Sequence, residues 1–222
     1  MNARSSPSRV HLAVRDPERT RDRILTAALK EFSLHGFAGA RVDRIARMAR
    51  VNKRMLYHYF GNKDDLFREI LGRKLSQRAA WAAAAPEEPA ASLEYWFEIV
   101  CREIDWLRLT QWEALEHRNG HIVRQAERRA ALADSVERVA RAQARGLMAR
   151  DLDAEDALLC MAALTTYPMV FPQIVRLVTG LRPTDPVFQR RWKQALRRLA
   201  HALWSRHAAR PRSAWAGNGQ AR

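Results

Sequence analysis

The stretch Arg41–Lys63, RVDRIARMARVNKRMLYHYFGNK, decides the fold of this chain. Apolar residues recur at helical spacing from Val42 onward, which predicts a short helix with one buried face. Asn52 is a good N-cap for a second short helix, because its side chain can accept from free backbone N–H groups. In that helix Leu56 and Phe60 share one face, and basic and aromatic residues occupy the other. The pattern predicts a helix-turn-helix, in which one helix braces and the other enters the major groove of DNA.

Basic and aromatic side chains in this stretch are the candidates for contact with a double-stranded DNA operator. Lys and Arg neutralise phosphates, and aromatic hydroxyls reach phosphate oxygens or base edges. The residues predicted to approach base edges are Lys53, Arg54, Tyr57 and His58. The predicted phosphate contacts are Arg41, Asn52, Tyr59 and Lys63, and Arg44 is a further candidate.

Residues on both sides complete a helical domain. An amphipathic helix before the stretch stops at Gly36, and Asn62 followed by Asp65 starts another helix in the manner of a capping box. From about Thr20 to Leu71, ILTAALKEFSLHGFAGARVDRIARMARVNKRMLYHYFGNKDDLF resembles the DNA-binding domain of the TetR family of bacterial transcriptional regulators. The resemblance implies a dimeric, all-helical repressor whose C-terminal domain binds a small molecule and dimerises.

Two positions depart from the family pattern. Ala40-Arg41 stands where the family usually has a small hydroxyl residue that caps the first helix of the motif, so this cap should be weaker. Arg50 stands where the family turn usually carries glycine. If Arg50 adopts a positive φ, its side chain costs on the order of 1 kcal/mol.

Length and charge agree with this interpretation. A chain of 222 residues can hold one small and one medium domain, and a formal net charge of +15 favours an anionic partner. A general arginine bias of the genome would explain much of the charge outside the motif.

Cys101 and Cys160 are the only cysteines, which predicts no disulfide framework and suits a reducing cytoplasm. The N-terminus lacks the apolar region of a signal peptide.

We divide the chain into a disordered basic arm (1–17), a helix-turn-helix DNA-binding domain (18–62), a helical effector-binding and dimerisation domain (63–208) and a disordered tail (209–222). The predicted fold class is all-α, with an N-terminal three-helix DNA-binding domain followed by a helical ligand-binding and dimerisation domain. Whether the arm contacts DNA stays open.

Membrane and enzyme functions find little support. Ala157–Leu177 is apolar and almost long enough to span a bilayer, but Pro168, Pro172 and Arg176 favour a bent helix in a bundle, so no membrane partner is predicted. There is no HExxH, no GxGxxG and no phosphate-binding loop. No catalytic residue, metal site or cofactor is therefore predicted.

Two sets of apolar residues are candidates for ligand binding and dimerisation. Aromatic side chains in the C-terminal helices are predicted to line one cavity for a planar or hydrophobic effector, and ordinary core packing is the alternative for each. They are Trp96, Trp106, Trp112, Tyr167 and Phe171. The helix around Ala157–Thr179 and the last helix, around Asp185–Arg206, are predicted to pair with their symmetry mates in a four-helix homodimer interface. Its predicted residues are Phe188, Trp192, Leu196, Leu199 and Leu203.

Two functions remain. The first is a ligand-responsive transcriptional regulator that acts as a repressor. It binds a palindromic operator as a homodimer, and a small hydrophobic or aromatic effector releases it from the DNA. The alternative is a DNA-binding architectural or partner-controlled protein without a small-molecule site. A ligand-sized cavity lined by Trp96 and Tyr167 would favour the first.

Overall fold

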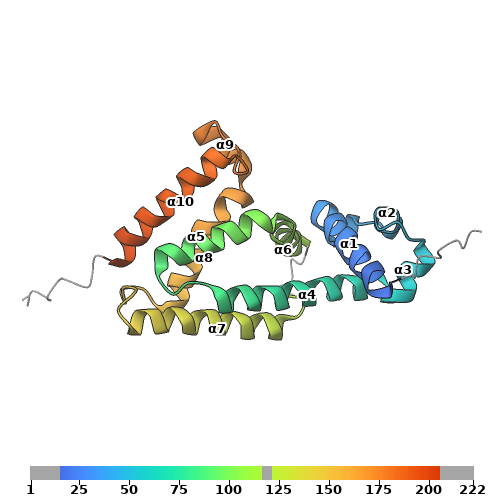
Figure 1. Ribbon diagram of the computed structural model, residues 1–222, viewed down its shortest axis with the longest axis horizontal. Helices are drawn as coiled ribbons and strands as arrows, with labels where there is room; N and C mark the ends of the chain where they lie inside the picture. Colours follow the sequence, from blue (N-terminus) through green and yellow to red (C-terminus); the bar gives the residue numbers. More distant parts are fainter. Residues whose placement is uncertain (1–15, 117–121, 206–222) are drawn as a thin grey trace, which may run out of the picture.

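The computed structural model describes residues 16–116 and 122–205, and these residues form helices with no strand among them (Figure 1). The predicted all-α class is confirmed. Most of the predicted arm and all of the predicted tail lie outside the described residues. The helices are α1 (Pro17–Gly39), α2 (Val42–Met48), α3 (Lys53–Phe60), α4 (Lys63–Ala84), α5 (Pro89–Arg102), α6 (Ile104–Glu116), α7 (Gln125–Ala144), α8 (Ala154–Val170), α9 (Pro172–Thr179) and α10 (Pro186–Ala200), followed by a π-helical turn (His201–Ser205).

Helices α1 to α3 pack around one apolar core. Phe32, Ile45 and Leu56 are completely buried in it, one from each helix. The predicted stop at Gly36 is confirmed, because Gly36 has a φ of 68° and a ψ of 179° and interrupts the regular helix. We call α1 to α3 the head.

Helix α4 links the head to the rest of the protein. It begins at the head, where Leu66 and Ile70 enter the head's core, and runs alongside α7 at its other end (Figure 1). The remaining helices form a second core, in which α5 packs against both α8 and α10. Leu93 and Phe97 of α5 meet Leu196 of α10 there, all three completely or almost completely buried.

The apolar stretch predicted as one bent helix is two helices. Helices α8 and α9 meet at an angle of 79°, with Phe171 at the break and Pro172 as the first residue of α9. Proline has no N–H to continue the hydrogen-bond ladder, so the chain turns there. Within the described residues, no single helix is long and apolar enough to cross a membrane; α8 and α9 reach that length only as a bent pair.

The turn between α2 and α3 contains an arginine in a conformation that favours glycine. Arg50 has a φ of 54°, and its carbonyl accepts a hydrogen bond from the Arg23 side chain at 3.3 Å. We expect Arg50→Gly to stabilise the protein by up to about 1 kcal/mol, because the left-handed conformation strains a residue with a Cβ, and the greater backbone entropy of unfolded glycine offsets part of this gain. Urea denaturation would measure the change.

Arg47→Gly is the matched control for this turn. Arg47 is also exposed but lies in the last turn of α2 with helical geometry. Glycine there should destabilise by about 1 kcal/mol. A loss of stability in both variants would contradict the strain assigned to Arg50.

Candidate nucleic-acid interface and effector cavity

Helix α3 has a buried edge and an exposed edge. The Asn52 side chain accepts from the Met55 backbone N–H at 2.7 Å, so the predicted cap is present. Leu56 and Phe60 are buried in the head's core. The exposed edge carries Arg54, Tyr57 and His58, which share an outer surface as the sequence predicts.

Three other predicted DNA contacts are partly engaged within the protein. Lys53 Nζ lies 3.1 Å from Asp43 Oδ1, and this hydrogen bond raises the pKa of Lys53 above its ordinary value. Lys63 Nζ lies 4.7 Å from the centre of the Phe37 ring. Tyr59 is partly buried against the head's core. These side chains must rearrange, or share their partners, to reach DNA.

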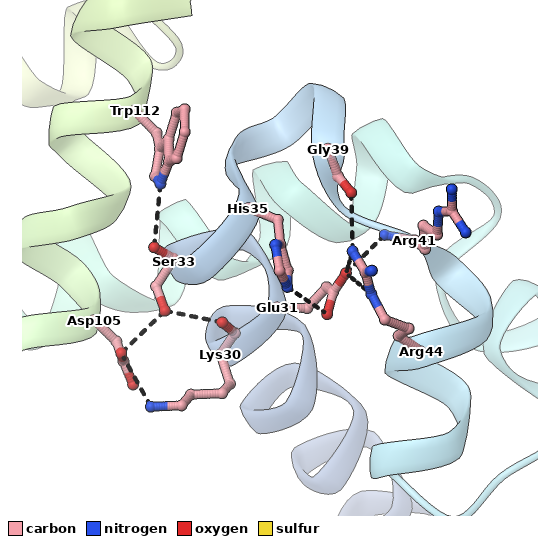
Figure 2. Close-up of polar contacts among 9 residues, drawn as sticks. All are labelled: Lys30, Glu31, Ser33, His35, Gly39, Arg41, Arg44, Asp105 and Trp112. Atoms are coloured by element: carbon pink, nitrogen blue, oxygen red, sulfur yellow. Dashed lines mark hydrogen bonds and ion pairs between the residues drawn. The ribbon is translucent and has the colours of Figure 1, made fainter.

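Arg44 lies beside Glu31 and Gly39 of α1, and its side chain is 35% exposed (Figure 2). Its Nε donates to Glu31 Oε1 at 2.7 Å and its terminal nitrogen donates to the Gly39 carbonyl at 3.0 Å. The Arg41 backbone N–H donates to the same Glu31 oxygen at 2.9 Å, whereas the exposed Arg41 side chain gives α2 no cap, as predicted. Arg44 is therefore a partner of Glu31 within the head, and a contact of Arg44 with DNA stays a prediction.

Glu31 is the centre of this network, and its side chain is only 3% exposed. Burial alone would raise the pKa of Glu31, but the hydrogen bonds from Arg44 and the Arg41 backbone outweigh it, and the pKa falls below the ordinary value. Glu31 is thus ionised at neutral pH and holds the start of α2 against α1.

Helix α6 of the C-terminal half holds the head from the other side (Figure 2). The Trp112 indole N–H donates to the Ser33 carbonyl at 3.2 Å, and Ser33 Oγ donates to Asp105 Oδ1 at 3.0 Å. Lys30 Nζ lies 3.6 Å from the same carboxylate oxygen. Side chains of α6 thus bind both the backbone and the side chains of α1.

Helix α6 also receives the end of α1. Glu116 accepts from the backbone N–H groups of Phe37 and Ala38, at 3.2 and 3.3 Å. Leu109 of α6 is buried in the head's own core. The head is therefore joined to the C-terminal half through α6 as well as through α4.

A cavity of about 120 Å³ lies between α4, α5, α7 and α8. Its wall is largely apolar and includes Trp96 from α5, Val139 from α7 and Met161 from α8. Arg78 of α4 and Arg138 of α7 also line it. An engineered apolar cavity of comparable size holds benzene, so this space fits a small aromatic or aliphatic group.

Of the five aromatic residues predicted to line one pocket, Trp96 lines this cavity and the other four do not. Trp106 packs against the head's core, and Trp112 binds α1. Both belong to α6, which lies on the head. Sequence reasoning placed these residues in helices but could not place the helices relative to one another.

Tyr167 and Phe171 also lie away from the cavity. Both are more than one-third exposed, and their rings pack at 5.2 Å between centres. Helix α8 lines the cavity with Thr165 and Thr166, so Tyr167, one position further, turns to a different face. The bend at Phe171 likewise lies outside the cavity wall.

Sequence reasoning missed the two arginines of the cavity. A signal for Arg78 was present: it occupies the same face of α4 as Leu71, Leu75 and Ala82, at spacings of three and four residues. A charged residue within an apolar stripe faces either a core or a ligand. The signal for Arg138 is weaker, because α7 carries arginines on several faces.

The predicted dimer residues mostly serve the chain's own core. Phe188 and Leu196 are buried between α10 and its neighbours, and the Trp192 indole N–H donates to the Leu164 carbonyl at 3.2 Å. Leu199 is partly buried, and Leu203 is 51% exposed. An apolar stripe marks a buried side of a helix but does not reveal whether the same chain or a partner buries it.

In the part of the chain that the structure describes, no three His, Cys, Asp or Glu side chains gather as a metal site would require. A helix-turn-helix head joined to a helical domain with a cavity between its helices defines a class of DNA-binding regulator. Comparison with protein families matches residues 24–70 to bacterial regulatory proteins of the TetR family and residues 94–201 to a tetracyclin repressor-like C-terminal domain. The chain belongs to the TetR family.

Individual relatives agree with this assignment. The HTH-type transcriptional repressor SCO4008 of Streptomyces coelicolor is 36% identical over 169 residues, 76% of this chain and 88% of the relative. The repressor NicS of Pseudomonas putida is 52% identical over 54 residues, 24% of this chain and 26% of the relative. The solved structure of the regulator SCO4942 from Streptomyces coelicolor has a TM-score of 0.71 at 27% identity, covering 84% of this chain and 99% of that one.

Proposed function

We propose that this protein is a repressor that binds a palindromic DNA operator as a homodimer and is released by a small effector bound in the cavity. One observation carries this proposal: α4 starts in the head at Lys63 and lines the cavity with Arg78 and Ala82. A ligand that moves the cavity wall therefore moves a helix that holds the head. The cavity favours this function over an architectural protein without a small-molecule site.

The comparisons support the class of function. SCO4008 and NicS are both named transcriptional repressors. AibR, a protein with the same fold (TM-score 0.61, 17% identity), has been solved with isovaleryl coenzyme A and operator DNA. The effector acts through its different affinities for the DNA-binding and released states, because a ligand with equal affinity for both shifts nothing.

Selection of bound fragments from genomic DNA tests this function. We expect enrichment of a palindromic site, since two heads related by a two-fold axis require mirrored half-sites. The enriched fragment, labelled for fluorescence anisotropy, then reports release during a metabolite screen. Enrichment without sequence preference, or binding that no small molecule weakens, would favour the architectural alternative.

We expect Arg54→Ala to weaken operator binding by about 1–3 kcal/mol and to relax sequence preference, because its side chain stands free on the exposed edge of α3. Lys63→Ala should weaken binding to all sequences alike and reduce the salt slope by about one unit. Anisotropy titrations at several salt concentrations measure both effects. The control is Arg129→Ala, because Arg129 is an exposed arginine on α7. If the Arg54 and Lys63 variants lose no more operator affinity than this control, Arg54 and Lys63 do not contact DNA.

We propose that the second copy of the chain covers an exposed apolar face on α8, α9 and α10. A monomer rarely exposes so many large apolar side chains on consecutive elements. The exposed large apolar residues from α8 to the π-helical turn after α10 are named here the C-terminal apolar face: Leu159, Tyr167, Phe171, Ile174, Leu177, Val178, Val187 and Leu203. This face lies on the helical segments that the sequence predicts for the interface, and of the five predicted residues it includes Leu203.

Charge placed on this face should separate the two copies. Leu159 and Leu177 are 68% and 82% exposed, so Leu159→Arg and Leu177→Arg leave the monomer's core intact. In a dimer they would bury unpaired charges. Sedimentation should show monomers or a strongly weakened dimer. Leu132→Arg, on the exposed side of α7, is the control, and intact dimers for both interface variants would exclude this face.

A further inference from the structure

The cavity combines an apolar wall with cationic side chains. Val139, Met148 and Met161 form part of its wall and belong to the buried core of the C-terminal half. Arg78 and Arg138 line the same space. The wall can thus cover an apolar group while a guanidinium reaches a polar one.

Three of the four hydroxyl groups on the wall, all except that of Ser92, are already engaged as donors. Ser135, Thr165 and Thr166 each donate to a carbonyl oxygen one turn earlier in their own helix, at 3.0, 2.9 and 2.7 Å. A hydroxyl has one proton, so these three groups can offer a ligand only acceptor capacity. The donors that remain for a ligand include the two guanidinium groups.

The charged groups other than Arg78 have partners within the protein. Arg138 donates to the Ala85 carbonyl at 2.7 Å, next to the end of α4. Glu87, the acidic residue on the cavity wall, pairs with Arg145. The negative charge on the wall is therefore compensated by a cation that does not line the cavity.

Arg78 has no such partner. Within the described residues, no carboxylate lies within ion-pair distance of its guanidinium, which lies 5.0 Å from the Trp96 ring centre. Burial lowers the pKa of Arg78, yet an arginine stays protonated in proteins. A partly buried, unpaired positive charge is unfavourable unless a ligand supplies the counter-charge.

We propose that the effector is a small carboxylate: its planar head group pairs with the Arg78 guanidinium and its apolar body packs against Trp96, Val139 and Met161. A planar guanidinium matches a carboxylate with two parallel hydrogen bonds. This inference rests on the proposed function and narrows its hydrophobic or aromatic effector to an anionic one. The cavity volume of about 120 Å³ suits a body the size of one ring or a short chain.

Calorimetry with the full-length protein tests the charge preference using matched probes. Phenylacetate is compared with phenylacetamide and phenethylamine, and octanoate with octanamide and octylamine. We expect each acid to bind about ten-fold or more tightly than its amide, because a hydrogen bond to a charged group is replaced by a weaker one. The ammonium compounds should bind least.

Variants then assign the preference to Arg78. Arg78→Met should bring the acid and the amide within about two-fold of each other, and Arg78→Lys should keep part of the preference. Arg141→Met is the control, since Arg141 pairs with Glu137 on the exposed side of α7 and does not line the cavity. If Arg78→Met still binds the acid more tightly than the amide by the wild-type factor, Arg78 only covers the Trp96 ring. That result would overturn the proposal that Arg78 binds the carboxylate.

The wild-type data separate this inference from the proposed function. Equal binding of acid and amide, preference for the ammonium compound, or binding of neither acid overturns the carboxylate proposal. If an amide or an amine binds and causes the protein to release the operator, the proposed function holds and only the carboxylate proposal is wrong. The proposed function itself fails when genomic selection yields no sequence preference, or when no compound in the metabolite screen releases the operator.

Discussion

Replacing Glu31 by alanine is expected to destabilise the protein by about 3 kcal/mol, because it removes a buried carboxylate that accepts from two partly buried donors. Glu31 is 2% exposed and accepts from Arg44 Nε and from the Arg41 backbone N–H. Without it the Arg44 charge loses its counter-ion, and α2 loses its attachment to α1. Urea denaturation should show the loss, and operator binding should weaken with it.

Asp22→Ala is the matched control on the same helix. Asp22 also pairs with an arginine, Arg73, but both side chains are about half exposed. Such surface pairs contribute less than about 1 kcal/mol, so this variant should be nearly neutral. Equal effects of the two substitutions would contradict the central role assigned to Glu31.

The same carboxylate should make stability depend on pH. The pKa of Glu31 lies below its ordinary value of 4.5 in the folded protein. A lowered pKa gives stability that is complete above the ordinary value and is lost as pH falls through the folded-state pKa. The stability difference between wild type and Glu31→Gln should stay constant near neutrality and narrow below about pH 4.

Gly36→Ala is the second substitution with a large expected effect. The φ of 68° and ψ of 179° at Gly36 are accessible almost only to glycine, and a residue with a Cβ there costs about 1–3 kcal/mol. The added Cβ would also overlap Glu116 Oε1 and lie 3.0 Å from the Trp112 ring. We expect a loss of about 3 kcal/mol, with α6 displaced from the head.

Further variants divide this effect into its causes. Gly39→Ala is the control, since a Cβ there would lie 3.5 Å from the His35 Cβ, an ordinary contact. Gly36→Ala combined with Glu116→Ala removes the overlap with Glu116 but leaves the backbone strain; its reference is Glu116→Ala alone, which also lacks the hydrogen bonds to Phe37 and Ala38. Urea denaturation of these variants, monitored by tryptophan fluorescence, measures how much stability the overlap and the backbone strain each cost. A Gly36→Ala protein as stable as Gly39→Ala would refute the strain.

Local features of the head followed from the sequence because they depend on residues three or four positions apart. The caps at Asn52 and Asn62, the stop at Gly36 and the buried positions Leu56 and Phe60 are all set by hydrogen bonds and periodicity within a single turn or helix. The resemblance to a known family rested on the same short-range pattern, and the comparisons confirm it.

The partners of the charged residues depended on tertiary structure. Arg44 has the composition and position of a DNA contact, but its acceptor Glu31 stands 13 residues earlier, in another helix. A short-range pattern reports which face of a helix is polar. It does not report that a carboxylate from a neighbouring helix is buried beneath that face.

The position and the lining of the cavity depend on how the helices pack against one another. By itself, the sequence determined an all-helical chain with a DNA-binding head and apolar stripes on its later helices. Tertiary structure decided that α6 would carry Trp106 and Trp112 to the head, that α10 would bury Phe188 and Leu196 within its own chain, and that Arg78 would line a cavity. The physical reason is that an apolar stripe specifies burial, whereas the partner that buries it is set by the packing of all the helices together.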